Sequence, residues 1–223
     1  MKIAIIGAAG QVGRRLARRL IEHGDDVTGL FRRPEQAEVV TAAGATPHVF
    51  DLTVSTPEDL AQALRGHDAV VFCAGAHGTG MDQTSLIDGK GVEKAIIAAD
   101  AAMVRRTILV SAMPEAASGR EVSEDFAHYL TVKKEAEQVL AGSGLDWLIV
   151  RPGHLTDDDG NGRVRAGLAE PYGQIQRDDV AAFLLEVLHE PRLSRHIIEL
   201  VDGPSTIPEA VDTLVELYGT PHL

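Results

Sequence analysis

The sequence predicts an α/β protein in which a doubly wound parallel sheet lies between two layers of helices, giving three layers (α/β/α). Short apolar runs alternate with segments whose apolar residues recur at helical spacing along most of the 223 residues. The first run, residues 3–6, is apolar throughout, as in a strand buried on both faces. A glycine-rich stretch, residues 7–13, follows, and Val12, Leu16 and Leu20 are then spaced as on one side of a helix. Together these observations predict a strand, a turn and a helix in direct succession.

The three glycines of this turn are expected to have separate roles. Gly7 permits a tight turn, Gly10 lets backbone amides approach a diphosphate, and Gly13 lets the helix lie close to the strand. The first amides of the helix and its positive dipole end then form an anion site. The spacing is G-x-x-G-x-x-G, and the alternative is a glycine-rich turn that binds nothing. The residues predicted to contact a dinucleotide here are Gly7, Ala9, Gly10, Gln11, Val12 and Gly13.

Strands and helices continue to alternate after this turn. Gly24, Gly44 and Gly142 lie where helices are expected to stop, whereas Pro57 and Ser123 lie where helices are expected to begin. The predicted strands cover residues 3–6, 26–32, 47–52, 68–76, 107–111, 146–151 and 196–201. The predicted helices cover residues 11–23, 35–43, 57–64, 82–102, 124–141, 178–189 and 208–218. Residues 154–176 show no periodicity and are predicted to form a loop.

Composition and charge restrict the classes of partner. The net charge of −12 makes nucleic acids and anionic membrane surfaces poor partners. The single cysteine, Cys73, excludes an internal disulfide. No apolar stretch approaches the length of a membrane span and no signal-peptide pattern is present, so a cytoplasmic location is expected. Residues 1–223 are predicted to form one domain with a small C-terminal elaboration from about residue 153, as a monomer or a homodimer.

Basic residues near the second strand favour NADP over NAD. In NAD-preferring folds an acidic residue about 20 positions after the glycines binds the ribose 2′-hydroxyl. Here Arg32 and Arg33 stand at the end of that strand, and Arg14 and Arg15 follow Gly13. The two basic pairs are expected to converge on the adenosine 2′-phosphate; the alternative for Arg32 and Arg33 is a solvated basic face. Two further residues, Asp51 and Leu52, are expected beside the adenine.

The fourth predicted strand opens into small residues, as a backbone facing a ribose requires. The residues predicted to contact the cofactor there are Cys73, Ala74 and Gly75. Cys73 is expected to be a small buried apolar residue rather than a nucleophile, since no basic residue lies near it in the sequence. The nine histidines show no spacing typical of a metal site, and no metal is predicted.

Tyr129 and Lys133 lie four residues apart, on one face of a predicted helix. A neighbouring ammonium favours the phenolate, so Lys133 is expected to lower the pKa of Tyr129 and prepare it for acid–base chemistry. Ser111 ends the adjacent strand on the side of the predicted cofactor site, where its hydroxyl can bind a substrate carbonyl or alcohol. The alternative is a chance pairing of tyrosine and lysine on a helix.

Taken together, these segments resemble the atypical short-chain dehydrogenase/reductases of the NmrA-like, NAD(P)H-binding kind, and are similar to proteins named NAD-dependent epimerase/dehydratases. The resemblance extends over essentially the whole chain. The matching motifs are residues 7–13, Asp88-Gly89, Val110-Ser111-Ala112, Tyr129 with Lys133, residues 143–157 and residues 177–181.

The resemblance implies a Rossmann domain that binds NADP(H) and a catalytic set of Ser111, Tyr129 and Lys133. In the better-known enzymes an asparagine completes the set; the sole asparagine here, Asn161, lies in the late loop, so the resemblance places Asp88 in that role. Ser111 and Lys133 would also contact the cofactor. The residues implied at its nicotinamide end are Pro152, Gly153 and His154.

The expected function is that of an NADP(H)-dependent oxidoreductase, with NAD(H) the less favoured cofactor. Its substrate is expected to be a small carbonyl, quinone or flavin-like molecule, held between the cofactor and residues 113–122 and 154–176. The alternative is a non-catalytic protein that binds NADPH as a redox sensor, because a carboxylate at Asp88 adds a charge beside the site of hydride transfer. A structural assembly factor that keeps the cofactor for stability is a third, weaker hypothesis.

Overall fold

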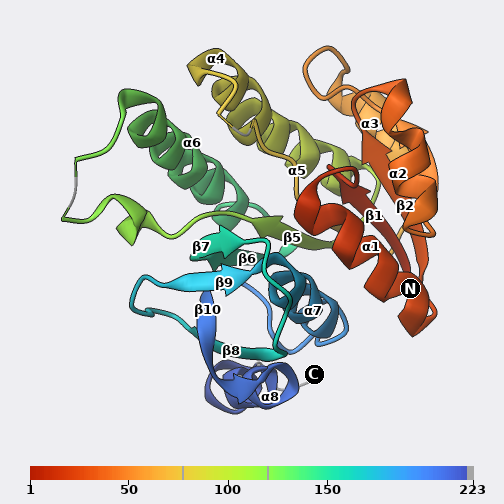
Figure 1. The fold of residues 1–223 in the computed structure, drawn as a ribbon. Helices are drawn as coiled ribbons and strands as arrows, with labels where there is room; N and C mark the ends of the chain where they lie inside the picture. Colours follow the sequence, from red (N-terminus) through yellow and green to blue (C-terminus); the bar gives the residue numbers. More distant parts are fainter. Residues whose placement is uncertain (77, 120, 220–223) are drawn as a thin grey trace.

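The structure, a computed structural model, describes residues 1–76, 78–119 and 121–219 (Figure 1). Its main sheet has the strand order β3-β2-β1-β4-β5-β6-β10-β8, and a small second sheet pairs β7 with β9. All neighbours in the main sheet are parallel except β8, which runs antiparallel to β10. The strands are β1 (Lys2–Ile6), β2 (Asp26–Phe31), β3 (Thr46–Val49), β4 (Ala69–Phe72), β5 (Arg106–Val110), β6 (Asp146–Pro152), β7 (His154–Thr156), β8 (Arg163–Gly167), β9 (Gln174–Gln176) and β10 (His196–Thr206). The order 3-2-1-4-5-6 confirms the predicted Rossmann-type fold.

Helices cover both faces of the main sheet. One apolar core joins the sheet to α1, α2, α7 and α8, and a second joins it to α3, α5 and α6. The α-helices are α1 (Gln11–His23), α2 (Ala37–Ala42), α3 (Pro57–Leu64), α4 (Met81–Thr84), α5 (Gly91–Ala101), α6 (Glu124–Ala141), α7 (Arg177–Leu188) and α8 (Ile207–Tyr218). The described residues also contain two short 3₁₀ helices, η1 (Pro34–Gln36) and η3 (Pro114–Ala117), and one π-helical segment, η2 (Ser85–Lys90).

The alternation of side chains in β1 explains why an unbroken apolar run forms a strand here. Ile3 and Ile5 are fully buried in the core that includes α1 and α7. Ala4 and Ile6 are buried in the core on the opposite face, with α3 and α5. Successive side chains of a strand point to opposite faces, so a strand at the centre of a three-layer protein needs apolar residues at every position.

Several predicted ends shift in the structure: the strand predicted over residues 68–76 ends at Phe72, and the strand predicted over residues 196–201 continues to Thr206. Two regions differ more. The helix predicted over residues 82–102 is divided, because η2 separates α4 from α5 with wider π-helical turns. Residues 154–176, predicted to be a loop, contain β7, β8 and β9. Their strands are short and pair with distant segments, such as β8 with β10, so no local period marks them.

Arg106 of β5 ties the main sheet to the end of α7. Its guanidinium donates to the carbonyl oxygens of Val187 (2.5 Å) and Leu193 (2.8 Å), and forms an ion pair with Asp146 (3.0 Å). The side chain of Arg106 is 7% exposed. Because the last carbonyl groups of a helix have no partners within the helix, this buried cation takes the place of a C-cap.

Replacing Arg106 by methionine should lower the free energy of unfolding by about 3 kcal/mol, since it leaves buried carbonyl groups without donors. The matched control is Arg105→Met, which removes an exposed arginine one residue earlier and should change the free energy by about 0.5 kcal/mol or less. Urea denaturation of the three proteins measures both values. Equal stability of the two variants would contradict the role given to Arg106.

Candidate functional site

Two adjoining cavities lie at the carboxyl ends of the parallel strands. The first, the dinucleotide cavity, has a volume of about 420 Å³, and the second, the reaction cavity, has about 480 Å³. Both are lined by Gln11, Cys73, Ala74 and Gly75, so they form one continuous groove across the ends of β1 and β4. This is the edge at which doubly wound sheets bind their ligands.

The turn after β1 brings the start of α1 close to the strand. Gly7 has φ +89°, and a Cβ atom there would lie 2.6 Å from the backbone nitrogen of Ala74. A Cβ atom at Gly13 would lie 2.5 Å from the carbonyl oxygen of Gly7. Any side chain at either position would therefore force β1, β4 and α1 apart.

The amino end of α1 carries no capping group from the protein. Its N-cap residue is Gly10, without a side-chain hydrogen bond, and its first turn contains no acidic residue. By contrast, α3, α6 and α8 each have a Ser or Thr cap and at least one acidic residue in the first turn. The first N–H groups of α1 therefore face the groove without an internal acceptor, which suits a phosphate.

Arginine residues stand at the outer end of the dinucleotide cavity. The Arg32 guanidinium lies 3.4 Å from a carboxylate oxygen of Asp51 and donates to Gln83 at 3.3 Å. Arg33 also lines the cavity and pairs with Glu35 at 3.1 Å. Burial alone would raise the pKa of Asp51, but hydrogen bonds from Thr53 and the nearby Arg32 outweigh it and lower that pKa, so Asp51 is ionised at neutral pH. Leu52 lines the same cavity.

The prediction that Arg14 and Arg15 converge on the adenosine end is wrong. Arg14 donates to the Gln11 side chain at 2.6 Å, and Arg15 donates to the same oxygen. Arg15 also forms ion pairs with Asp157 and Asp178, at 3.7 and 3.3 Å. Asp157 and Asp178 thus hold Arg15 away from the dinucleotide cavity, and Arg14 is not among the described residues that line that cavity.

A buried ion pair lies beneath the reaction cavity. Asp88 of η2 is fully buried, and one of its carboxylate oxygens lies 3.1 Å from the ammonium of Lys133 on α6. The other oxygen accepts a hydrogen bond from the Ala76 amide (2.9 Å). Lys133 also donates to the carbonyl of Val110 (3.1 Å), which leaves one of its three donors for a ligand. The sequence and the resemblance named both residues; the structure places them in direct contact.

Ser111 follows β5 and lines the reaction cavity. The residue is 5% exposed, and its side-chain oxygen has no partner among the described residues. Buried hydroxyl groups are almost always hydrogen-bonded. The Ser111 hydroxyl is therefore available to a ligand in this cavity.

Tyr129 lies one helical turn before Lys133 and lines the same cavity, with the Lys133 ammonium 5.8 Å from the centre of its ring. Burial raises the pKa of the Tyr129 phenol, and the charge of Lys133 opposes this rise without cancelling it, so the expected net lowering is wrong for this structure. Burial alone would lower the pKa of Lys133, but the charges of Tyr129 and Asp88 outweigh it and raise that pKa. The phenol is protonated and the ammonium charged at neutral pH.

Cys73 lies where the two cavities meet. Burial raises the pKa of its thiol to about 12, so the thiolate is negligible at neutral pH. This agrees with the expected role of a small apolar residue rather than a nucleophile.

The three residues implied at the nicotinamide end lie apart from both cavities. Pro152 and Gly153 are buried and His154 is exposed, and the described residues that line the cavities include none of them. A Cβ atom at Gly153 would lie 2.2 Å from the carbonyl oxygen of Gly173, and His154 donates its amide to the same oxygen. The glycine thus permits the pairing of β7 with β9.

Two residues that the sequence analysis did not single out, Leu155 and Arg177, line the reaction cavity instead. Arg177 begins α7 and pairs with Asp157 at 3.0 Å. Residues 177–181 were part of a matching motif. The pairing of β7 with β9 brings the start of this motif, Arg177, to the reaction cavity beside Leu155.

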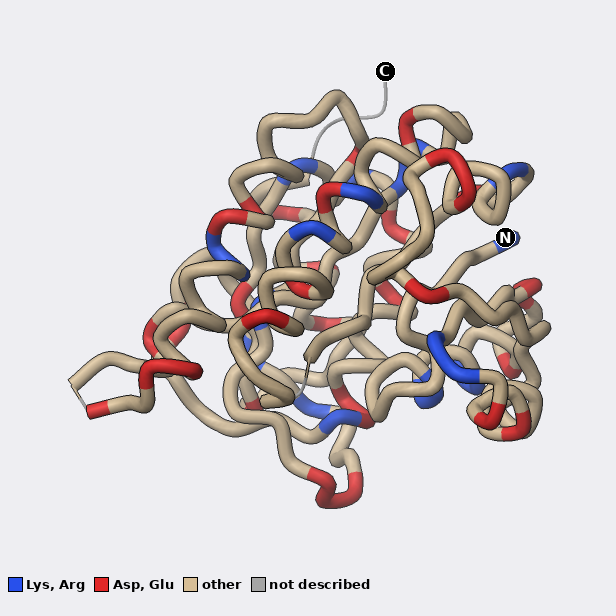
Figure 2. The backbone as a smooth tube through the Cα atoms, turned by 90° about the horizontal axis from the view of Figure 1, so that it is seen from above, with Lys and Arg blue, Asp and Glu red and all other residues tan. Residues whose placement is uncertain are grey.

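Positive charge at the groove comes from Arg32 and Arg33 in the dinucleotide cavity and from Lys133 and Arg177 in the reaction cavity. In Figure 2, Asp and Glu are spread along the whole chain, with Lys and Arg scattered between them. Within the part of the chain that the structure describes, no helix is long and uncharged enough to span a bilayer.

Comparison with known proteins identifies close relatives. The chain is 38% identical over 216 residues to the uncharacterized sugar epimerase YhfK of Bacillus subtilis, covering 96% of this chain and all of the relative. A solved structure from Bacillus halodurans, provisionally named an NAD-dependent epimerase/dehydratase, is 32% identical with a TM-score of 0.87, covering 96% of this chain and all of that one.

A short-chain dehydrogenase/reductase from Veillonella parvula, solved in complex with NADP, shares the fold. It is 22% identical with a TM-score of 0.72, covering 92% of this chain and 95% of that one. The sequence model of the NAD(P)H-binding family matches residues 7–191, which include the glycine turn and all the described residues that line the two cavities except Ile6. The chain belongs to this NAD(P)H-binding family, and its relatives above 30% identity include proteins named as a sugar epimerase and as an NAD-dependent epimerase/dehydratase.

Proposed function

We propose that this chain is an NADP(H)-dependent oxidoreductase that reduces a small carbonyl, quinone or flavin-like substrate. The observation that carries the proposal is the convergence of Ser111, Tyr129 and Lys133 on one cavity that continues into the glycine turn of α1. A hydride acceptor bound there would lie beside a hydrogen-bond donor, a protonated phenol and an ammonium.

The uncapped end of α1 suits the diphosphate of the dinucleotide, and Arg32 and Arg33 suit a 2′-phosphate at its adenosine end. Asp51 and Leu52 line the same cavity and are proposed to contact the adenine. Preference for NADP over NAD is part of this proposal. The nicotinamide end is proposed to reach past the lining residue Leu155 to Pro152, Gly153 and His154, which directly precede it in the chain. The remaining cofactor contacts proposed are Gly7, Ala9, Gly10, Gln11, Val12, Gly13, Cys73, Ala74, Gly75, Ser111 and Lys133.

Each residue of the reaction cavity then has a chemical role. NADPH, when bound, supplies the hydride. Ser111 donates a hydrogen bond to the substrate oxygen, which stabilises the negative charge that develops there. Tyr129 gives its proton to that oxygen, and its raised pKa keeps the proton in place until then. Lys133 offers its free donor to the cofactor ribose and stabilises the phenolate, while Asp88 positions Lys133.

The walls of the reaction cavity favour a flat substrate. The rings of Phe126 and Tyr129 lie nearly parallel, with an angle of 24° between them and centres 6.0 Å apart. Stacking on aromatic rings and a volume of about 480 Å³ suit a small conjugated carbonyl compound. The proposed C-terminal elaboration of the single domain, from about residue 153, contributes Leu155 and Arg177 to the reaction cavity. Residues 220–223 lie outside the described residues.

A second function is favoured by one observation. The buried Asp88 carboxylate neutralises much of the charge of Lys133, which reduces its ability to stabilise a phenolate. A protein that binds NADPH and senses its redox state would keep the groove without turnover. A cytoplasmic location and a monomeric or dimeric state remain predictions.

Replacement of Tyr129 by phenylalanine should reduce NADPH oxidation about 100-fold or more and leave the NADPH dissociation constant unchanged, since the phenol donates a proton but does not hold the cofactor. The assay follows absorbance at 340 nm with a panel of aldehydes, ketones, quinones and flavins, and includes a nucleotide sugar because of the relatives' names.

Tyr218→Phe, on α8, is the control for loss of a phenol and should retain full activity. Because burial raises the pKa of Tyr129 above that of a free phenol, the reduction rate should stay level through neutral pH and fall only at a pH where a free tyrosine is already ionised. An unchanged rate in Tyr129→Phe would exclude this mechanism, and tight binding without turnover of any substrate would support the sensor.

Replacement of Arg32 by alanine should weaken NADP⁺ binding about tenfold and leave NAD⁺ binding nearly unchanged, since it removes a charged donor from the 2′-phosphate. Titration of tryptophan fluorescence with each nucleotide measures both constants. Arg65→Ala, an exposed arginine at the end of α3, serves as the control. Equal affinities for the two nucleotides in the unmutated protein would contradict the assignment.

The glycines of the turn should respond differently to alanine. Gly13→Ala should lower the free energy of unfolding by about 1–3 kcal/mol, because its Cβ atom would lie 2.5 Å from a backbone oxygen. Gly10→Ala should fold with nearly normal stability, since its closest contact would be 3.1 Å, but should weaken NADP⁺ binding about tenfold by obstructing the diphosphate. Thermal melts with and without NADP⁺ distinguish the two effects. Normal NADP⁺ affinity in Gly10→Ala would place the diphosphate elsewhere.

A further inference from the structure

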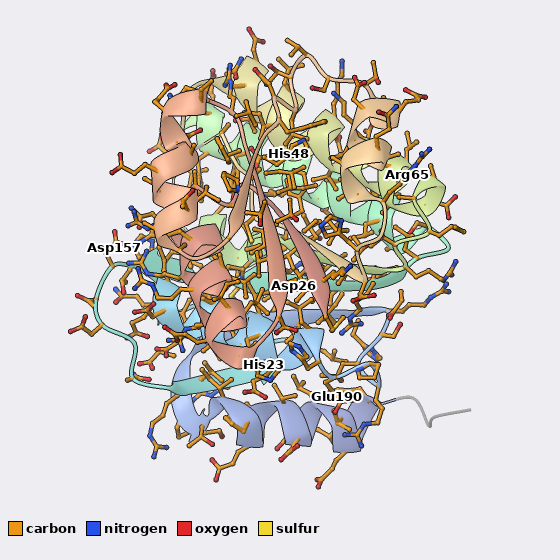
Figure 3. All side chains as sticks on the ribbon, turned by 90° about the vertical axis from the view of Figure 1, so that its right-hand side faces the viewer. His23, Asp26, His48, Arg65, Asp157 and Glu190 are labelled. Atoms are coloured by element: carbon orange, nitrogen blue, oxygen red, sulfur yellow. The ribbon has the colours of Figure 1, made fainter. Side chains whose placement is uncertain are left out.

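Two histidines and an aspartate meet at the edge of the sheet opposite to the groove. His23 is the last residue of α1, Asp25 precedes β2, and His189 follows α7. In Figure 3, His23 lies near Asp26 at the lower end of the strands, and His48 of β3 lies toward the upper end. Because 164 residues separate Asp25 from His189, no local spacing in the sequence marks this cluster.

The three side chains direct their ligand atoms toward one another. His23 Nδ1 lies 2.9 Å from one carboxylate oxygen of Asp25, and His189 Nε2 lies 3.1 Å from the other. One ligand atom from each residue lies within 4.8 Å of the other two, and the two imidazole rings have centres 4.4 Å apart. A single ion with bonds of about 2.0–2.2 Å can reach all three after small side-chain adjustments.

His189 contacts a backbone carbonyl through one ring nitrogen and Asp25 through the other. His189 Nδ1 lies 3.0 Å from the carbonyl oxygen of Leu185, which can only accept, so Nδ1 carries a proton. Nε2 then faces a carboxylate oxygen of Asp25 at 3.1 Å, a separation that either a shared proton or a bound cation bridges. A backbone carbonyl on the far nitrogen is also the usual arrangement of a metal-binding histidine.

The arrangement of the three side chains suits a single shared ion. An Asp25 carboxylate oxygen also pairs with the Met1 ammonium at 2.7 Å, a contact that a bound ion replaces or shares. One divalent ion engages both imidazole rings and the carboxylate at once. The Asp25 side chain is 2% exposed, whereas that of His23 is 51% exposed, so the anion is buried while the site stays open to entry from solvent.

We propose that His23, Asp25 and His189 bind a divalent transition-metal ion, with Zn²⁺ the best match to two imidazoles and one carboxylate. The fourth position is open to water. The ion joins the end of α7 to the turn between α1 and β2, so it strengthens the packing of α7 on α1. The site lies at the opposite edge of the sheet from the reaction cavity, which gives the ion a structural rather than a catalytic role.

The test uses untagged full-length protein, treated with EDTA and then dialysed against ZnCl₂ with metal content measured. We expect one Zn²⁺ per chain, and at least about tenfold weaker binding in His23→Gln and in His189→Gln. His48→Gln, an exposed histidine on β3, is the matched control and should bind like the unmutated protein. Mg²⁺, which prefers oxygen ligands, should not compete.

Two further readouts report on the site itself. Co²⁺ should give a visible absorption spectrum in the unmutated protein and in His48→Gln but not in His189→Gln. Zn²⁺ at about a hundredfold excess over its dissociation constant should raise the melting temperature by about 5 °C or more, and EDTA should reverse the rise. NADPH binding should be the same with and without the metal.

Two results would overturn the proposal. If the unmutated protein binds no Zn²⁺ beyond what His189→Gln retains, a proton alone lies between His189 and Asp25. If Zn²⁺ binds equally to the unmutated protein, His23→Gln and His189→Gln, its site lies elsewhere in the chain. Neither result bears on the reductase proposal, because none of the three residues lines the groove.

Discussion

The close approach of α1 to β1 is the contact on which the rest of the groove depends. With glycine at positions 7 and 13, the first turn of α1 packs directly against the backbone of residues 7 and 8, and the turn at Gly7 packs against the backbone of residues 73 and 74, just after β4. The amide groups at the helix start then point along the carboxyl edge of the sheet rather than into solvent. A methyl group at either glycine would separate these backbones and close the space that a diphosphate needs.

A second constraint is electrostatic and lies deeper in the protein. Asp88 and Lys133 are both buried, and each compensates the charge of the other. Removing one would leave an uncompensated charge in a medium of low dielectric constant, which is why such pairs are kept together. The pair holds η2 against α6, and through its bonds to Ala76 and Val110 it connects these helices to the loop after β4 and to the last residue of β5. Tyr129 and Ser111 owe their positions over the groove to this framework.

The two edges of the sheet therefore have different character. The carboxyl edge carries the groove, with an unpaired hydroxyl at Ser111 and an uncapped helix end, as a ligand-binding edge requires. The amino edge gathers His23, Asp25 and His189 around one buried carboxylate. The central strands are buried on both faces, so polar chemistry is confined to these edges.

The sequence by itself determined the fold and the location of the groove, because both follow from local patterns. Apolar runs, helical spacing and three glycines predict the succession of elements, and the family match confirms the nucleotide-binding class. Even the ends of α1 and α3 were predicted to the residue, since Gly24 stops one helix and Pro57 starts the other. These signals act over a few residues, so they can be interpreted without the rest of the chain.

Only the tertiary structure decided the properties that depend on distant segments. Arg15 pairs with Asp157 and Asp178 rather than with the cofactor site, and residues 154–176 pair as strands with partners far along the chain. The direction of the Tyr129 pKa shift depends on burial that no local pattern reveals. The His23 cluster needs a partner 164 residues beyond Asp25. Charge pairing, desolvation and metal geometry depend on distances in space, and the order of residues along the chain does not contain these distances.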